Sequence, residues 1–183
     1  MTHHTHLSDK QIAILAADIY EDQELWYPYY RLKEAGADVT VIGSEAKEYT
    51  SKHGYPVTAG KAAREVDPSD FDGVIVPGGY APDKLRRDPD ILDFVREIDK
   101  AGKLVAAICH AGWVLISASI LEGRNATCYH AIVDDVKNAG ANYSDEAVVV
   151  DDNLVTSRSP ADLPQWLPAI MDVLAEQKEP MTA

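Results

Sequence analysis

Short, continuous apolar runs alternate with longer amphipathic segments along most of this chain of 183 residues. The segments expected to form strands lie at residues 11–17, 38–43, 73–76, 104–108 and, as two strands around a turn, 146–156. Strands that are apolar on both faces occur in parallel sheets with helices on both sides. The pattern therefore predicts an α/β fold, a three-layer sandwich with a mostly parallel, flavodoxin-like sheet.

The amphipathic segments between these runs are expected to form helices. They lie at residues 22–35, 88–102, 111–121, 131–139 and from 159 onward. Residues 46–61 are polar and predict a small hairpin or excursion. We expect a flexible tail at residues 1–9, one domain over 10–176 and a second tail at 177–183.

The composition excludes several classes of partner. The chain has 17 basic and 30 acidic residues, a net charge of -13, which disfavours nucleic acid and anionic membranes. The N-terminus has no apolar signal core, and no apolar run approaches the roughly 20 residues of a membrane span. With only Cys109 and Cys128, no disulfide framework is expected, so we predict a cytoplasmic location.

No sequence signature for a cofactor or a metal is present. Neither a P-loop nor a dinucleotide-binding glycine pattern occurs, and no Cys/His set has structural zinc spacing. All six histidines lie at or before His130, so the late histidine of a glutamine-hydrolysing triad is missing. We therefore expect no cofactor, no metal and no glutaminase activity.

Unusual residues follow three of the predicted strands. They are Ile19-Tyr20-Glu21, Pro77-Gly78-Gly79 and Cys109-His110. Because the carboxyl ends of parallel strands meet at one edge of a sheet, these residues predict a functional site there.

Cys109 stands where a strand ends and a helix is expected to begin, the position of a nucleophile elbow. The leading end of that helix would lower the pKa of the thiol from about 8.5 to near 7. The alternative is a buried core cysteine without reactivity.

A carboxyl near the first strand is a candidate proton partner for the sulfur. If Glu21 is held protonated, it and Cys109 would share one proton and titrate as a pair. The alternative is an ordinary acid at a helix N-terminus, one of four in this stretch: Asp18, Glu21, Asp22 and Glu24.

Other groups near the strand ends carry open alternatives. The Gly78-Gly79 pair predicts either backbone N–H groups directed at an oxyanion or a plain tight turn. His110 is a candidate base for the thiol, or a residue that caps the helix or faces solvent. His130 is a second candidate base, and Tyr129 beside it is a candidate hydrogen-bonding group in the cleft.

Several segments together resemble the PfpI-type intracellular peptidase family. They are IYEDQELWYPYYRLKEAGADVTVIG, VIVPGGYAPD, AAICHAGW, YHAIVDDVKNAGANY and SRSPADLPQW, which occur in the family's order from about residue 10 to 176. The wider superfamily includes the parkinsonism-associated redox protein and the class I glutamine amidotransferase domains. The resemblance implies an amidotransferase-like fold with a nucleophile elbow.

The resemblance also implies roles for individual residues. Cys109 would be the nucleophile, Glu21 the carboxyl that stabilises its thiolate or sulfinate, and His110 its partner. The backbone N–H groups of Gly79 and His110 would form the oxyanion site, and Tyr129 would line the pocket. Asp83 stands where the family often has a glutamate donated by a neighbouring subunit, and it is one methylene shorter. A homodimer or larger homo-oligomer is implied.

Three functional hypotheses follow. The first is a stress-protective, cysteine-dependent enzyme of the peptidase, glyoxalase or deglycase kind, acting on small activated carbonyls or short peptides. The second is a non-enzymatic redox sensor whose Cys109 is oxidised to sulfenate or sulfinate. The third is a scaffold protein with an inert Cys109.

Overall fold

The computed structural model describes residues 6–177, and its centre is a seven-stranded sheet. The strand order is β10–β11–β7–β6–β1–β2–β5, and every pairing is parallel except that of β10 with β11. The strands of this sheet are β1 (Gln11–Leu15), β2 (Asp38–Gly43), β5 (Lys61–Ala62), β6 (Gly73–Val76), β7 (Leu104–Ile108), β10 (Val148–Asp151) and β11 (Leu154–Ser157). The predicted, mostly parallel α/β sheet is confirmed.

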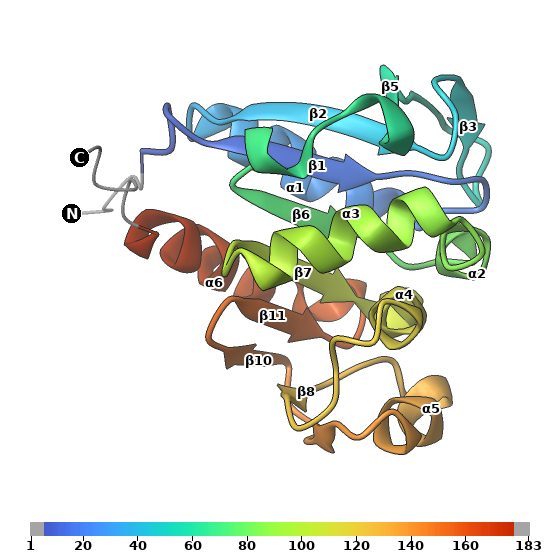
Figure 1. Ribbon diagram of the computed structural model, residues 1–183, viewed down its shortest axis with the longest axis vertical. Coiled ribbons are helices and arrows are strands. Elements are labelled where there is room, and N and C mark those ends of the chain that lie inside the picture. The colour runs from blue at the N-terminus through green and yellow to red at the C-terminus, as the bar shows by residue number, and fades with distance from the viewer. Residues whose placement is uncertain (1–5, 178–183) are drawn as a thin grey trace.

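Helices cover both faces of the sheet, as Figure 1 shows. They are α1 (Asp22–Glu34), α2 (Ala81–Leu85), α3 (Pro89–Lys100), α4 (Gly112–Ser117), α5 (Val133–Asn138) and α6 (Leu163–Glu176). Helices α1 and α6 contact each other and pack on one face, whereas α3 and α4 pack on the other. The molecule is therefore the expected three-layer sandwich.

The middle strands β6 and β7 are buried along their whole length, and β1 is exposed only at Gln11. Their side chains are almost entirely apolar, which gives both helix layers a surface to pack against. In Figure 1 these strands point the same way, so their carboxyl ends reach one edge of the sheet, near α2 and α4. The strand-end residues singled out above lie at this edge.

Two small sheets lie outside the central one. Strands β3 (Glu48–Thr50) and β4 (Pro56–Thr58) form an antiparallel hairpin, which confirms the predicted excursion at residues 46–61. Strands β8 (Asn125–Ala126) and β9 (Asn142–Tyr143) pair in parallel and were not predicted. The β3–β4 hairpin matters for the site because it packs beside the end of β1.

The structure differs from the sequence expectations at several boundaries. The helix expected at 111–121 is a 3-10 turn, Cys109–Ala111, followed by the six residues of α4. The expected N-terminal tail at 1–9 extends too far, because Leu7 is fully buried and its N–H donates to the Ala35 carbonyl at 2.8 Å. The remaining parts of the expected tails, residues 1–5 and 178–183, lie outside the described residues.

Candidate active site

The ends of β1 and β6 are joined by backbone contacts at the edge of the sheet. Tyr20 forms a β-bridge with Gly79 on one side and with Ser51 of the hairpin loop on the other. The Glu21 N–H donates to the Gly78 carbonyl at 3.2 Å, which fixes the start of α1 against the glycine turn. Cys109 follows the neighbouring strand β7, so the three predicted strand ends do meet.

Cys109 has the strained backbone of a nucleophile elbow. Its φ is 63°, in the left-handed region that costs a residue with a side chain about 1–2 kcal/mol. The Tyr129 N–H donates to the Cys109 carbonyl at 3.2 Å and helps to hold the turn. The residue is only 9% exposed, so Cys109 is largely buried.

The imidazole of His110 is in contact with the sulfur. Its Nδ1 lies 3.2 Å from the Cys109 Sγ, within the distance for proton transfer. The ring is held between Trp113 and Tyr129, whose ring centroids are 5.1 and 4.8 Å away. Burial is the largest cause that lowers the pKa of His110, and the neighbouring His130 and Lys52 lower it further, so the ring is neutral at pH 7 and can accept a proton.

Two backbone N–H groups stabilise the charged form of the sulfur. They belong to Gly79 and His110, the pair that the family resemblance implies for an oxyanion site, and they lower the pKa of the Cys109 thiol. Gly79 has a φ of 73°, and a Cβ there would lie 2.5 Å from the Ile19 carbonyl oxygen. Only glycine fits this turn without moving the backbone. The conformation and the packing of Gly79 together therefore fix the position of its N–H group.

The buried carboxyl beside the sulfur belongs to Glu24. Its side chain is completely inaccessible, and its Oε2 accepts the Gly78 N–H at 2.7 Å. Among the residues that the structure describes, its Oε1 has no hydrogen-bond partner. Burial, outweighing the hydrogen bond from Gly78, raises the pKa of Glu24 to about 8, so the carboxyl holds a proton at pH 7.

This position was expected for Glu21, and the structure places that residue elsewhere. Glu21 is the N-cap residue of α1, and its carboxylate forms an ion pair with Lys52 of the hairpin. Glu24 lies one helical turn further on, on the face that also buries Leu25 and Pro28. The helix therefore turns Glu24, rather than Glu21, toward Cys109.

The expected lowering of the Cys109 pKa is not the net result. Burial and the negative charge of Glu24 raise it to about 12, although the N–H groups of His110 and Gly79 oppose this. Protonated Glu24 has no negative charge, and in that state it no longer raises the pKa of Cys109. Between about pH 8 and 12 the two acids therefore carry one negative charge between them.

Comparison with known proteins places this arrangement in a family. The sequence profile of the DJ-1/PfpI family matches residues 10–173. The chain belongs to the DJ-1/PfpI family.

Relatives in this family have informative names. A deglycase of Pyrococcus abyssi is 44% identical over 164 residues, which cover 90% of this chain and 99% of the relative. General stress protein 18 of Bacillus subtilis is 43% identical over 160 residues, covering 86% and 93% of the two chains. The crystal structure of Drosophila melanogaster DJ-1beta superposes with a TM-score of 0.85 at 28% identity, covering 92% and 91%.

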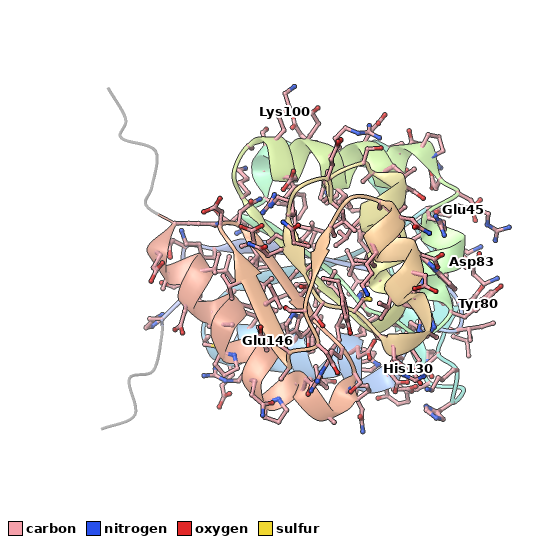
Figure 2. All side chains as sticks on the ribbon, turned by 90° about the horizontal axis from the view of Figure 1, so that it is seen from below. Glu45, Tyr80, Asp83, Lys100, His130 and Glu146 are labelled. Atoms are coloured by element: carbon pink, nitrogen blue, oxygen red, sulfur yellow. The ribbon has the colours of Figure 1, made fainter. Side chains whose placement is uncertain are left out.

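Two further predicted residues occupy different surroundings in this DJ-1/PfpI chain. Tyr129 packs against His110 and lines the site, as expected of a pocket residue. Asp83 lies on α2, at the outer edge of the molecule in Figure 2, where its carboxylate is 3.8 Å from Arg87. Among residues 6–177, Asp83 forms no hydrogen bond or ion pair with His110, so the role of third acid stays a prediction for a neighbouring copy.

One group of side chains comes close to the spacing of metal ligands. The ligand atoms of Glu21, Asp22 and His53 all lie within 4.8 Å of one another. Asp22 already accepts from Ser51 at 2.6 Å and lies 2.7 Å from His53, and Glu21 is paired with Lys52. These contacts satisfy the carboxylates without an ion.

None of the helices described is long and apolar enough to cross a bilayer.

Proposed function

We propose that this protein is a stress-protective enzyme that uses Cys109 to attack small activated carbonyl compounds, in the manner of a glyoxalase or deglycase. The observation that carries the proposal is the 3.2 Å contact between the Cys109 Sγ and the His110 Nδ1 at a strained elbow. The names of its relatives, a deglycase and a general stress protein, support the same class of chemistry.

Attack begins with transfer of a proton. His110 Nδ1 accepts the thiol proton while the sulfur forms a bond to the carbonyl carbon, and the π electrons move to the carbonyl oxygen. The backbone N–H groups of Gly79 and His110 stabilise that oxygen. The imidazolium then returns the proton to the oxygen, and the product is a hemithioacetal on Cys109.

For a 2-oxoaldehyde, the reaction continues by isomerisation. A base removes the proton from the carbon bonded to sulfur, and the hydroxyl on that carbon gives up its proton. The adjacent carbonyl gains one proton on carbon and one on oxygen, which converts the hemithioacetal to a thioester. Water then hydrolyses the thioester, releases a 2-hydroxy acid and restores the thiol. The net reaction adds one water and needs no external oxidant or reductant.

Glu24 keeps the site suited to this attack at neutral pH. With its pKa near 8, it presents a neutral carboxyl, which hydrogen bonds to a developing thiolate instead of repelling it. The unpartnered Oε1 is the atom with a hydrogen-bonding position to spare. We infer that Glu24 takes the role expected of Glu21.

Turnover of methylglyoxal tests the proposal. We expect the kcat/KM of Cys109→Ala to fall by at least about 100-fold, because the nucleophile is lost. Cys128→Ala is the matched control, since Cys128 is also a free, buried cysteine. Full activity in Cys109→Ala would end the proposal.

Oxidation of Cys109 is a second candidate function. The free Oε1 of Glu24 could donate to a sulfinate oxygen, which favours this oxidation product over a thiol. After mild peroxide treatment, we expect the mass gain to map to Cys109, with no carbonyl turnover if sensing is the whole function. Oxidation of Cys128 before Cys109 would contradict the redox-sensing function.

Assembly into a homodimer or a larger homo-oligomer stays a prediction. Light scattering, which measures the mass in solution, tests it.

A further inference from the structure

Lys52 stands beside the strand ends that build the site. Its backbone N–H donates to the Tyr20 carbonyl at 3.0 Å, and the preceding Ser51 forms a bridge with Tyr20. Tyr20 also bridges Gly79, and the adjacent Gly78 lies against Cys109, where an added Cβ would be 2.7 Å from the Cys109 Cβ. The hairpin loop therefore brings Lys52 to the wall of the site through two successive backbone contacts.

The side chain of Lys52 is held by one ion pair and stays partly exposed to solvent. Its ammonium pairs with Glu21, whose side chain is only 8% exposed, whereas the Lys52 side chain is 42% exposed. An ammonium has three N–H donors, so the pairing leaves donors for a further acceptor. Glu21 thus fixes the position of the solvent-facing Lys52 ammonium.

That charge acts on the reacting groups. The Lys52 ammonium lowers the pKa of His110 and opposes the rise in the pKa of Glu24. The Cys109 sulfur, in turn, raises the pKa of Lys52. In a chain with a net charge of -13, a small anion approaching this edge needs such a cation to offset the general repulsion.

We propose that Lys52 binds a carboxylate on the carbon next to the one that the sulfur attacks, so that the site takes up small 2-oxo acids. The Cys109 sulfur adds reversibly to their keto carbon while the thiol proton passes to the carbonyl oxygen, which gives a hemithioketal. This inference rests on the proposed carbonyl chemistry at Cys109. Glu21 acts in it as a positioning residue, which holds the ammonium toward the reacting centre.

Alkylation of Cys109 by two matched reagents tests the role of Lys52. Iodoacetate and iodoacetamide both lose iodide to the sulfur, but only iodoacetate has a carboxylate on the adjacent carbon. We expect the ratio of the iodoacetate rate to the iodoacetamide rate at Cys109 to fall about fivefold in Lys52→Met, as for the loss of one partly exposed charge pair. Lys52→Arg should keep most of the ratio.

Lys47→Met is the matched control. Lys47 lies just before the same hairpin, is similarly exposed and pairs with Glu45, so its loss changes the net charge equally. An unchanged ratio in Lys52→Met, or an equal fall in Lys47→Met, would overturn the inference.

A second variant guards against misfolding. Lys52→Met leaves Glu21 buried without its partner, whereas Glu21→Gln/Lys52→Met removes both charges together. We expect the same fall in the ratio in this double variant, and an unchanged ratio would contradict the role of Lys52. The rate ratio requires no turnover, so inactivity of the wild type toward carbonyls would reject the proposed function while the ratio still decides the role of Lys52.

Discussion

The carboxyl of Glu24 and the side chain of Cys109 meet across the Cα of Gly78. A Cβ added to Gly78 would lie 2.6 Å from the Glu24 Oε2 and 2.7 Å from the Cys109 Cβ, closer than real contacts allow. The same glycine donates its N–H to Glu24 at 2.7 Å. The turn after β6 therefore lets two acids that are far apart in the sequence share one buried space.

Gly78→Ala is expected to push these two groups apart. The added methyl cannot be accommodated by a flexible side-chain end alone, because the Ile108 carbonyl oxygen is also 3.0 Å away. We expect a loss of stability of about 1–3 kcal/mol and a loss of most Cys109 reactivity. Thermal melting and alkylation rates measure both effects. Gly60→Ala, with nothing within 4 Å of the added carbon, should change neither.

Glu24→Gln is expected to change how stability depends on pH. The folded chain keeps the Glu24 proton up to about pH 8, whereas the unfolded carboxyl loses it near 4.5. The wild type should therefore lose stability relative to Glu24→Gln as the pH rises from 4.5 to 8, by at most about 5 kcal/mol. Denaturant unfolding at several pH values measures the difference.

The control for this series is Glu48→Gln, at an exposed position on β3. It should leave the stability difference nearly independent of pH. A difference between the wild type and Glu24→Gln that is constant from pH 4.5 to 8 would show that Glu24 titrates like an ordinary carboxyl.

His130→Gln is expected to shift the acid limb of Cys109 reactivity. His110 must be neutral to accept the thiol proton, so reactivity falls as the pH drops through its pKa. Burial is the largest cause of that low pKa, and the charge of His130 is the next. Removing His130 should move the acid limb to higher pH, whereas His53→Gln should not. A shift in the opposite direction would contradict the assigned role of His110.

Much of the architecture could be predicted from the sequence, since it depends on local periodicity. The apolar runs identified β1, β2, β6 and β7, and the residues after three of them identified the edge that holds Cys109. The short α4 was overestimated, because the apolar segment after Cys109 continues as a buried loop, where Leu121 is 1% exposed. Apolar character alone does not separate a helix from such a loop.

The choice between Glu21 and Glu24 could not be settled from adjacency to the strand. It depends on the residue at which α1 starts, and a shift of three positions decides which acid faces inward. One signal was available, because Glu24 lies next to Leu25 and one turn before Pro28 on the buried face. Lys52 gave no signal, since its place depends on the docking of the hairpin against Tyr20.

The most direct test of a nucleophilic Cys109 is its rate of alkylation by iodoacetamide at pH 7, with Cys128 in the same molecule as the reference. Burial raises the pKa of both thiols, but the His110 Nδ1 contacts only the sulfur of Cys109 among the described residues. Peptide mass spectrometry should show Cys109 reacting at least about tenfold faster, with the advantage lost in His110→Gln. Equal rates, or faster labelling of Cys128, would contradict a reactive Cys109.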